Sequence, residues 1–202
     1  MGNRAMLISE NSHVGIYLHW NGGLDSVGAF LKYCELRGFR GFDHDYGKAR
    51  FCQVVGNFFG GGMSMGIEYF ENIRDLEDWW LDNGVYIISG WEIKKRLYTP
   101  HENELEWEYN LEFLKYIDER QPESEQLGDY LESDDVDASE LEIGDVIFIP
   151  TIDCGFRQAT IAGISEEGIP YHDSYAHGYD NPNNCIAGIC KRKKKEKNDE
   201  CI

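Results

Sequence analysis

Hydrophobic and polar residues alternate in short runs along the first hundred positions of the chain. Residues 3–9 and 15–20 are β-like runs joined by a polar stretch, and this pattern predicts a hairpin. Apolar residues then recur at helical spacing, which predicts helices over Leu24–Arg37 and Tyr46–Phe59. Three further strands are predicted at residues 64–69, 85–89 and 91–98. The last two should form a hairpin, because Ser89-Gly90 between them is a favourable turn sequence.

After residue 100 the pattern becomes more polar. Asn110 is a suitable N-cap for a helix over Leu111–Glu119, and Pro122 can begin another short helix that reaches Leu131. β-branched runs follow at residues 146–149, 158–164 and 169–171. The first of these runs, with the residues just before it, resembles the first strand of small SH3-like barrels, a likeness of fold that carries no function.

Together these elements predict an α+β chain, with a mixed body of short strands and two or more helices followed by a small SH3-like β module. The length of 202 residues is sufficient for a buried core. The predicted boundaries are residues 1–133 for the α+β body, 134–140 for an acidic linker, 141–190 for the β module and 191–202 for a basic flexible tail.

Charge and composition narrow the functional classes. The chain has 37 acidic and 19 basic side chains, a formal net charge of −18, and 42% hydrophobic residues. This hydrophobic content is too high for a disordered chain, and no apolar run approaches the ~18 residues that cross a bilayer. The negative charge argues against binding of nucleic acid or of an anionic membrane by the folded body of the protein. The charge is also concentrated, because Glu102–Asp145 carries 17 acids and two bases, whereas residues 191–202 carry six bases and three acids.

A row of glutamates occupies the acidic segment. Glu102, Glu104, Glu106 and Glu108 alternate with Asn103, Leu105, Trp107 and Tyr109, which is the period of a strand with one carboxylate face. Same-face residues on a strand are ~6.8 Å apart, comparable to the few-ångström spacing of charges along nucleic acid. Two interpretations are open: a solvated face, or a mimic of a phosphate backbone that binds a basic partner. For the second, the predicted partner-binding residues are Glu102, Glu104, Glu106, Glu108, Glu112, Asp134, Asp135 and Asp137.

The turn at residues 21–26, Asn-Gly-Gly-Leu-Asp-Ser, lies between a predicted strand and a predicted helix. It resembles the pyrophosphatase loop of ATP-dependent adenylating enzymes, whose glycines let backbone N–H groups approach a phosphate. Asn21 replaces the usual first serine of that loop, and no clear parallel strand follows the helix. A capped Gly-Gly turn is therefore the alternative interpretation. If the turn serves an enzyme, the candidate catalytic residues are His19, Asn21, Asp25 and His44.

The cysteines and the C-terminal lysines give weaker signals. The six cysteines lack framework spacing and the chain starts without a secretory signal, which predicts reduced thiols in the cytoplasm. The spacing of five residues approaches that of a zinc site: Cys154, His172, His177, Cys185 and Cys190. The order of these residues in the sequence favours a polar loop with cysteines in the core. No metal or other cofactor is therefore predicted, and zinc binding is kept as an alternative. The basic run is a solvated tail, a segment folded back on the acidic body, or a nucleic-acid contact through Lys193, Lys194 and Lys195.

Five motifs carry a resemblance to other proteins. They are Gly2-Asn-Arg-Ala-Met-Leu, Tyr17-Leu-His-Trp-Asn-Gly-Gly, Tyr46-Gly-Lys-Ala-Arg, Val55-Gly-Asn-Phe-Phe-Gly-Gly and Asp82-Asn-Gly-Val-Tyr-Ile-Ile. Through these motifs, residues 2–98 resemble a group of proteins of unassigned activity from Gram-positive bacteria, their phages and mobile elements. The resemblance transfers no catalytic residue. It implies a context in which small acidic proteins often inhibit host defence, including anti-CRISPR proteins that act on Cas nucleases.

These observations lead to hypotheses of different classes. The favoured one is an acidic inhibitor in the cytoplasm of a host bacterial cell, which binds a basic host protein by charge mimicry and involves no membrane. A CRISPR nuclease, or its complex with RNA, is the partner that the resemblance implies. The alternative is a nucleotide-binding or RNA/DNA-cleaving enzyme that uses the Asn21–Ser26 turn and the nearby histidines. A third hypothesis is a housekeeping interaction module whose β portion binds protein.

Overall fold

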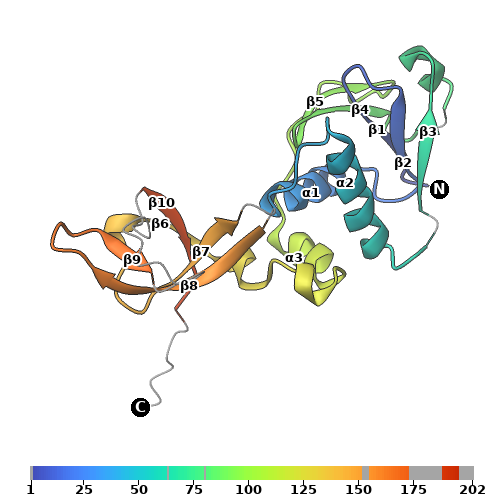
Figure 1. Cartoon of the computed structure of the whole chain (residues 1–202). Helices are drawn as coiled ribbons and strands as arrows, with labels where there is room; N and C mark the ends of the chain where they lie inside the picture. The colour runs from blue at the N-terminus through green and yellow to red at the C-terminus, as the bar shows by residue number, and fades with distance from the viewer. Residues whose placement is uncertain (1, 63, 80, 152–154, 173–187, 196–202) are drawn as a thin grey trace. The chain divides into compact units, whose positions relative to one another are not determined.

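The computed structural model describes the chain except at residues 1, 63, 80, 152–154, 173–187 and 196–202. The fold is α+β and has two compact units, Met1–Gln126 and Leu127–Ile202, each with its own five-stranded sheet (Figure 1). The predicted fold class is therefore confirmed. Within the described residues, no helix is long and apolar enough to cross a membrane.

The first unit is built on a sheet with the strand order β3-β2-β1-β4-β5. The strands are β1 (Ala5–Ser9), β2 (Val14–Leu18), β3 (Met65–Tyr69), β4 (Val85–Ser89) and β5 (Glu92–Leu97). β1 and β4 are parallel, and the other neighbouring pairs are antiparallel. Both predicted hairpins are present, as β1–β2 and β4–β5, and Gly90 in the second turn has a φ of 59°, which glycine adopts without strain.

Three helices accompany this sheet: α1 (Leu24–Leu36), α2 (Asp45–Phe58) and α3 (Leu111–Glu119). Aromatic side chains join them, because the ring centroid of Phe30 in α1 lies 5.1 Å from that of Phe58 in α2 and 6.0 Å from that of Phe113 in α3. The predicted N-cap of α3 is confirmed, since the side chain of Asn110 accepts a hydrogen bond from the Phe113 N–H.

The chain between β3 and β4, which includes a 3-10 helix at Ile73–Leu76, packs against the sheet. The buried cluster formed there contains Met6, Ile8, Phe70, Leu76 and Val85. All five residues of β1 are buried, as expected for a central strand covered on both faces. An ion pair between Arg4 and Asp82, 2.9 Å long, ties the start of β1 to the residues before β4 and lowers the pKa of Asp82 to about 2 through its hydrogen bonds.

The second unit contains an antiparallel sheet with the order β6-β10-β7-β8-β9. The strands are β6 (Asp134–Asp137), β7 (Val146–Thr151), β8 (Gly155–Ile164), β9 (Pro170–His172) and β10 (Ile189–Arg192). Its core contains Val136, Leu141, Ile147, Ala159 and Ile161. The strands at the two ends of this order, β6 and β9, are not neighbours, and the SH3-like barrel stays a prediction.

Three predicted segments differ from the structure. Residues 134–140, predicted as an acidic linker, form β6 and a 3-10 turn at Ala138–Glu140, and the division between the units falls after Gln126 rather than after residue 133. Lys191 and Arg192, predicted as part of a flexible tail, belong to β10. Both errors have one cause, the pairing of acidic β6 with β10, which contains Lys191 and Arg192. Neither strand has a clear alternation of apolar and polar residues, so the sequence pattern predicts neither of them. The short helix predicted from Pro122 is two 3-10 turns, Glu123–Glu125 and Gly128–Glu132.

Candidate acidic interaction surface

The glutamate row lies between β5 and α3 in the first unit. Glu102 is in a turn that the Glu104 N–H closes by donating to the His101 carbonyl, and the residues from Glu104 to Asn110 belong to no helix or strand. We define the acidic ridge as the side chains of Glu102, Glu104, Glu106 and Glu108. All four are exposed, and Leu105 and Trp107 between them are half-buried, but Asn103 and Tyr109 are exposed as well. The predicted alternation of exposure is therefore confirmed only from Glu104 to Glu108. The predicted strand is wrong, because this segment is not paired in either sheet. The ridge is instead held in place by side chains of α1 and β5.

Trp107 and Asp25 attach the ridge to α1. The indole of Trp107 lies directly over Gly28, and a Cβ atom at that position would overlap the ring. One turn earlier in the helix, the carboxylate of Asp25 accepts a hydrogen bond of 3.1 Å from the backbone N–H of Glu108. Gly28 therefore leaves room for Trp107 and Asp25 holds the backbone of Glu108, so two consecutive residues of the segment are fixed by α1.

A buried arginine attaches the other end of the ridge. Arg96 of β5 is only 3% exposed, and its guanidinium donates hydrogen bonds to the carbonyl oxygens of His101 at 3.2 Å and Glu104 at 3.3 Å. The same group lies over the ring of Tyr86, 5.0 Å from its centroid. Nη1 donates both hydrogen bonds, and Nη2 donates a third to the Asn83 carbonyl at 3.4 Å, a fixed two-nitrogen geometry that a lysine ammonium lacks. Sequence reasoning missed Arg96, because it is one of three consecutive basic residues and nothing local distinguishes it from Lys94 and Lys95.

The carboxylates of the ridge differ in how far they are already engaged. Glu102 accepts a hydrogen bond from the N–H of Tyr98 at 3.0 Å, and Glu104 lies 2.8 Å from the ring nitrogen of His101. For Glu106 and Glu108, the structure gives no side-chain hydrogen bond or ion pair with another described residue. Glu112, in the first turn of α3, pairs with Lys115 at 3.2 Å on an exposed face. The C-terminal half of the ridge, Glu106 and Glu108, thus presents carboxylates that the described part of the chain leaves uncompensated.

The predicted partner-binding acids of the second unit are already paired within the chain. Lys191 contacts Asp135 at 2.9 Å, and Lys194 contacts Asp134 at 3.8 Å. Asp137 accepts hydrogen bonds from the hydroxyl and the N–H of Ser139, which lower its pKa. Lys193 also reaches Asp129, at 2.6 Å. The basic run therefore folds back onto the acids, one of the three alternatives for this segment.

Asp145 is the most buried acid of this network, with its side chain 2% exposed. Lys195 lies 3.0 Å and Arg192 3.4 Å from its carboxylate, which also accepts a hydrogen bond from the N–H of Glu142. Burial raises the pKa of Asp145, but these hydrogen bonds and positive charges outweigh burial and hold the pKa below its ordinary value. Lys195 completes the network by contacting Glu142 at 2.7 Å. All three predicted nucleic-acid contacts, Lys193, Lys194 and Lys195, are thus engaged by carboxylates.

The Asn21–Ser26 turn has a packing role in the structure. Asn21 has a φ of 55°, and the next residue, Gly22, donates its N–H to the Asn3 carbonyl and accepts a hydrogen bond from the Tyr86 hydroxyl. A Cβ atom on Gly22 would collide with the backbone of Ala5, so close packing explains this glycine. β2, the strand before the turn, is antiparallel to both of its neighbours, and a phosphate loop of the adenylating type needs a parallel return.

The candidate catalytic residues of this region serve separate contacts. His19 lies 3.0 Å from the Tyr17 hydroxyl and edge-on to the ring of Trp20. His44 is exposed at the N-cap of α2, and Asp25 holds the ridge as described above. No described contact joins the two histidines to each other or to Asp25. The structure therefore does not assemble an acid–base set from them.

The possible zinc residues are only partly open to description. His172 is buried in β9 and Cys190 is half-buried in β10, while Cys154, His177 and Cys185 lie outside the described residues. Among the described residues, no group of three His, Cys, Asp or Glu side chains is arranged to hold a metal ion. Cys34 and Cys52 are free thiols in α1 and α2, and burial raises the pKa of the Cys52 thiol to about 11.

Comparison with known proteins adds no assignment to this geometry. No protein-family model, no curated protein and no solved structure matches the chain.

Proposed function

We propose that this protein is an acidic inhibitor that binds a basic, nucleic-acid-binding groove of another protein through the acidic ridge. The observation that carries the proposal is the row of four exposed carboxylates on an anchored segment outside the helices and strands, of which Glu106 and Glu108 are uncompensated among the described residues. On an extended chain these side chains recur at ~6.8 Å, a spacing at which lysines and arginines of a phosphate-binding groove can meet them. The anchoring lowers the entropy lost on binding, because the segment is ordered in advance.

The partner class follows from the resemblance of residues 2–98 to proteins of phages and mobile elements of Gram-positive bacteria. In that setting the partner is a host-defence nuclease, with a CRISPR nuclease or its RNA complex as the first candidate. The binding residues are those of the ridge, supplemented by Glu112 at the start of α3. Asp134, Asp135 and Asp137 stabilise the second unit in this proposal, because the chain already pairs or hydrogen-bonds their carboxylates.

The test compares two triple charge reversals of the same size. One variant carries Glu104→Lys, Glu106→Lys and Glu108→Lys on the ridge; the control carries Glu10→Lys, Glu71→Lys and Glu77→Lys at exposed positions of the same unit. Tagged full-length chains are incubated with lysate of a Gram-positive host at about 50 mM and about 500 mM salt, and bound proteins are identified by mass spectrometry.

We expect the parent and the control to retain a basic nucleic-acid-binding protein at low salt, and the ridge variant to lose it. Added single-stranded RNA or DNA should compete for the same partner, since both ligands occupy one groove. The proposal is wrong if the ridge variant and the control retain the same proteins, or if the captured partner binds nucleic acid unhindered. Circular dichroism of both variants establishes beforehand that the fold is intact.

A further inference from the structure

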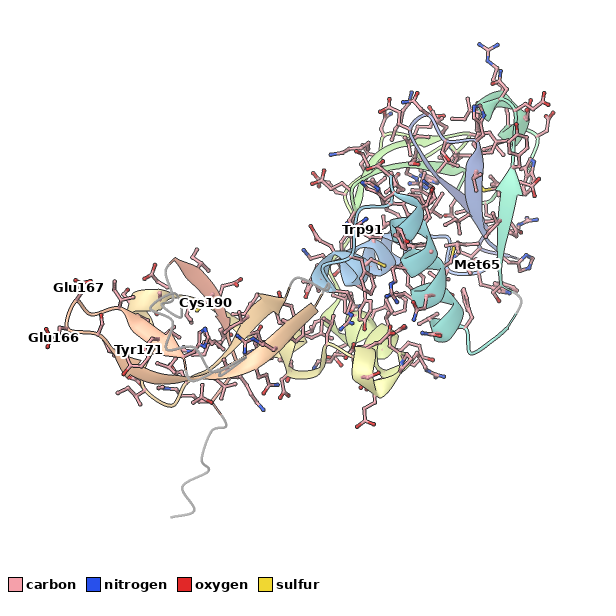
Figure 2. All side chains as sticks on the ribbon, in the orientation of Figure 1. Met65, Trp91, Glu166, Glu167, Tyr171 and Cys190 are labelled. Carbon is pink, nitrogen blue, oxygen red and sulfur yellow. The ribbon has the colours of Figure 1, made fainter. Side chains whose placement is uncertain are left out.

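The outer edge of β3 carries apolar side chains that the first unit leaves exposed. β3 is the end strand of its sheet, and Met65, labelled in Figure 2, begins it. Ile67 is 70% exposed and Tyr69 is 66% exposed, and both lie on the same face as Met65 because alternate residues of a strand share a face. On β2, Val14 faces Tyr69 and is 38% exposed. A contiguous apolar strip therefore borders an edge with which no described strand pairs.

The hydrogen bonds between β2 and β3 show which backbone groups face outward. The His19 N–H donates to the Ser64 carbonyl at 2.8 Å, and the Phe70 N–H donates to the His13 carbonyl at 3.0 Å. These bonds flank the opposed pairs Leu18–Met65 and Val14–Tyr69, which are thus non-hydrogen-bonded pairs of an antiparallel ladder. By alternation, the N–H and C=O groups of Met65, Ile67 and Tyr69 all point away from β2, towards the free edge.

The opposite edge of the same sheet is protected against further pairing. β5 has exposed lysines at positions 94 and 95, and lysine on an edge strand is a common device against strand addition. β3 has no basic residue and no proline, and its single charged side chain is Glu68 on the face opposite Ile67. The contrast marks β3 as the edge of this sheet that is open to a partner strand.

We propose that β3 pairs antiparallel with β3 of a second copy of this chain, about a two-fold axis through Ile67. In this register Ile67 of each copy faces Ile67 of the other, and Met65 faces Tyr69. All outward backbone groups of the three residues are then used, giving six hydrogen bonds between the copies. The apolar residues form cross-strand pairs on one face, and on the other face Glu68 lies opposite Gly66 rather than opposite another carboxylate. The strand is thus complementary to itself.

Repulsion between negative charges opposes this pairing, and its dependence on salt concentration can be used to identify the dimer. The two Glu68 side chains are diagonal neighbours at roughly 7–8 Å, and each chain has a net charge of −18. Salt screens both repulsions, so self-association becomes stronger as salt increases. Binding of a basic partner by the acidic ridge has the opposite response. The two interactions can therefore be separated in one preparation.

The test is sedimentation equilibrium of the full-length chain and of three single variants at about 50 mM and about 500 mM salt. Ile67→Lys places a lysine at the centre of the pairing, and Ile189→Lys is the matched control, because Ile189 is 76% exposed in β10 of the second unit. Glu68→Thr removes the diagonal repulsion and places a good strand former on the edge.

We expect a reversible monomer–dimer equilibrium for the parent that tightens with salt. Ile67→Lys should weaken it at least about a hundredfold, since each dimer loses two buried isoleucines and gains two facing charges. Ile189→Lys should behave as the parent, and Glu68→Thr should dimerise more tightly with a smaller salt effect. A parent that stays monomeric throughout, or a dimer that Ile67→Lys leaves intact, overturns the inference. Neither result bears on the ridge, which the lysate experiment tests independently.

Discussion

Gly28 contributes to the acidic ridge by having no side chain. It lies inside α1, where glycine costs about 1 kcal/mol relative to alanine, yet the indole of Trp107 occupies the space that a Cβ atom would need. Trp107 in turn sets the direction of its neighbours Glu106 and Glu108. A residue with no functional group thus determines which way two carboxylates face.

A double-mutant cycle tests this role. We expect Gly28→Ala to destabilise the first unit by about 1–2 kcal/mol, because overlap with Trp107 outweighs the gain in helix propensity. In a Trp107→Ala background the overlap is gone, and the same change should stabilise the unit by about 0.5–1 kcal/mol. Urea unfolding followed by far-UV circular dichroism gives the four free energies. If Gly28→Ala changes the unfolding free energy in the same direction in the parent and in the Trp107→Ala background, the packing argument is wrong.

Asp25 and Arg96 show what local sequence could not reveal about single residues. Asp25 is a candidate catalytic residue only if the Asn21–Ser26 turn serves an enzyme; in the structure its carboxylate accepts a hydrogen bond from the Glu108 N–H, 83 residues away. Arg96 was not singled out at all, although it holds two carbonyl groups of the ridge segment. The role of Asp25 depends on a contact between distant segments, which a local pattern does not show. The partners of Arg96 are only five and eight residues away, but nothing in the run of three basic residues shows that Arg96 is the buried one.

At the scale of elements, the β10 segment and the acids around it form the charge network that stabilises the second unit. Asp145→Asn preserves the shape of the side chain but leaves Arg192 and Lys195 facing a neutral amide. We expect a loss of about 1–3 kcal/mol in the unfolding free energy of the second unit at pH 7. The measurement is urea unfolding followed by far-UV circular dichroism at pH 7 and pH 3.

The pH dependence of this loss has a definite sign. The pKa of Asp145 is lowered in the folded state from an ordinary value of 3.8. Its stabilising contribution is therefore complete well above pH 4 and is lost as the pH falls below about 4, where the unfolded chain binds the proton more readily. The difference between parent and variant should shrink at pH 3. A difference that is equal at both pH values would show that the Asp145 charge does not stabilise the fold.

Elements with strong local patterns were predicted well. α1 and α2 were expected within one residue of their observed ends, because apolar spacing and flanking glycines are local signals. α3 was expected at its observed bounds, since Asn110 caps it. The ridge and β6 were predicted incorrectly for opposite reasons. The ridge has strand periodicity without a partner strand, whereas β6 has little periodicity but gains a partner through charge.

At the scale of the whole molecule, the net charge of −18 separates into parts with different consequences. In the second unit much of the acidity is offset by ion pairs with Lys191 to Lys195. In the first unit the ridge remains available to a partner, and the apolar edge of β3 is available to a second copy. If both proposals hold, acidic residues stabilise the second unit, bind a partner through the first and oppose self-association. We therefore expect these three properties to respond differently to salt.

The two units can be monitored separately because all five tryptophans, at positions 20, 79, 80, 91 and 107, lie in the first unit. Each unit has its own sheet and core, so we expect two unfolding transitions in urea, with tryptophan fluorescence reporting only the first unit and far-UV circular dichroism reporting both. Asp145→Asn should shift part of the dichroism signal to lower urea and leave the fluorescence midpoint unchanged. Gly28→Ala should shift the fluorescence midpoint. If Asp145→Asn moves the fluorescence midpoint as far as it moves the dichroism, the units unfold as one, and stability effects in the second unit would then reach the acidic ridge.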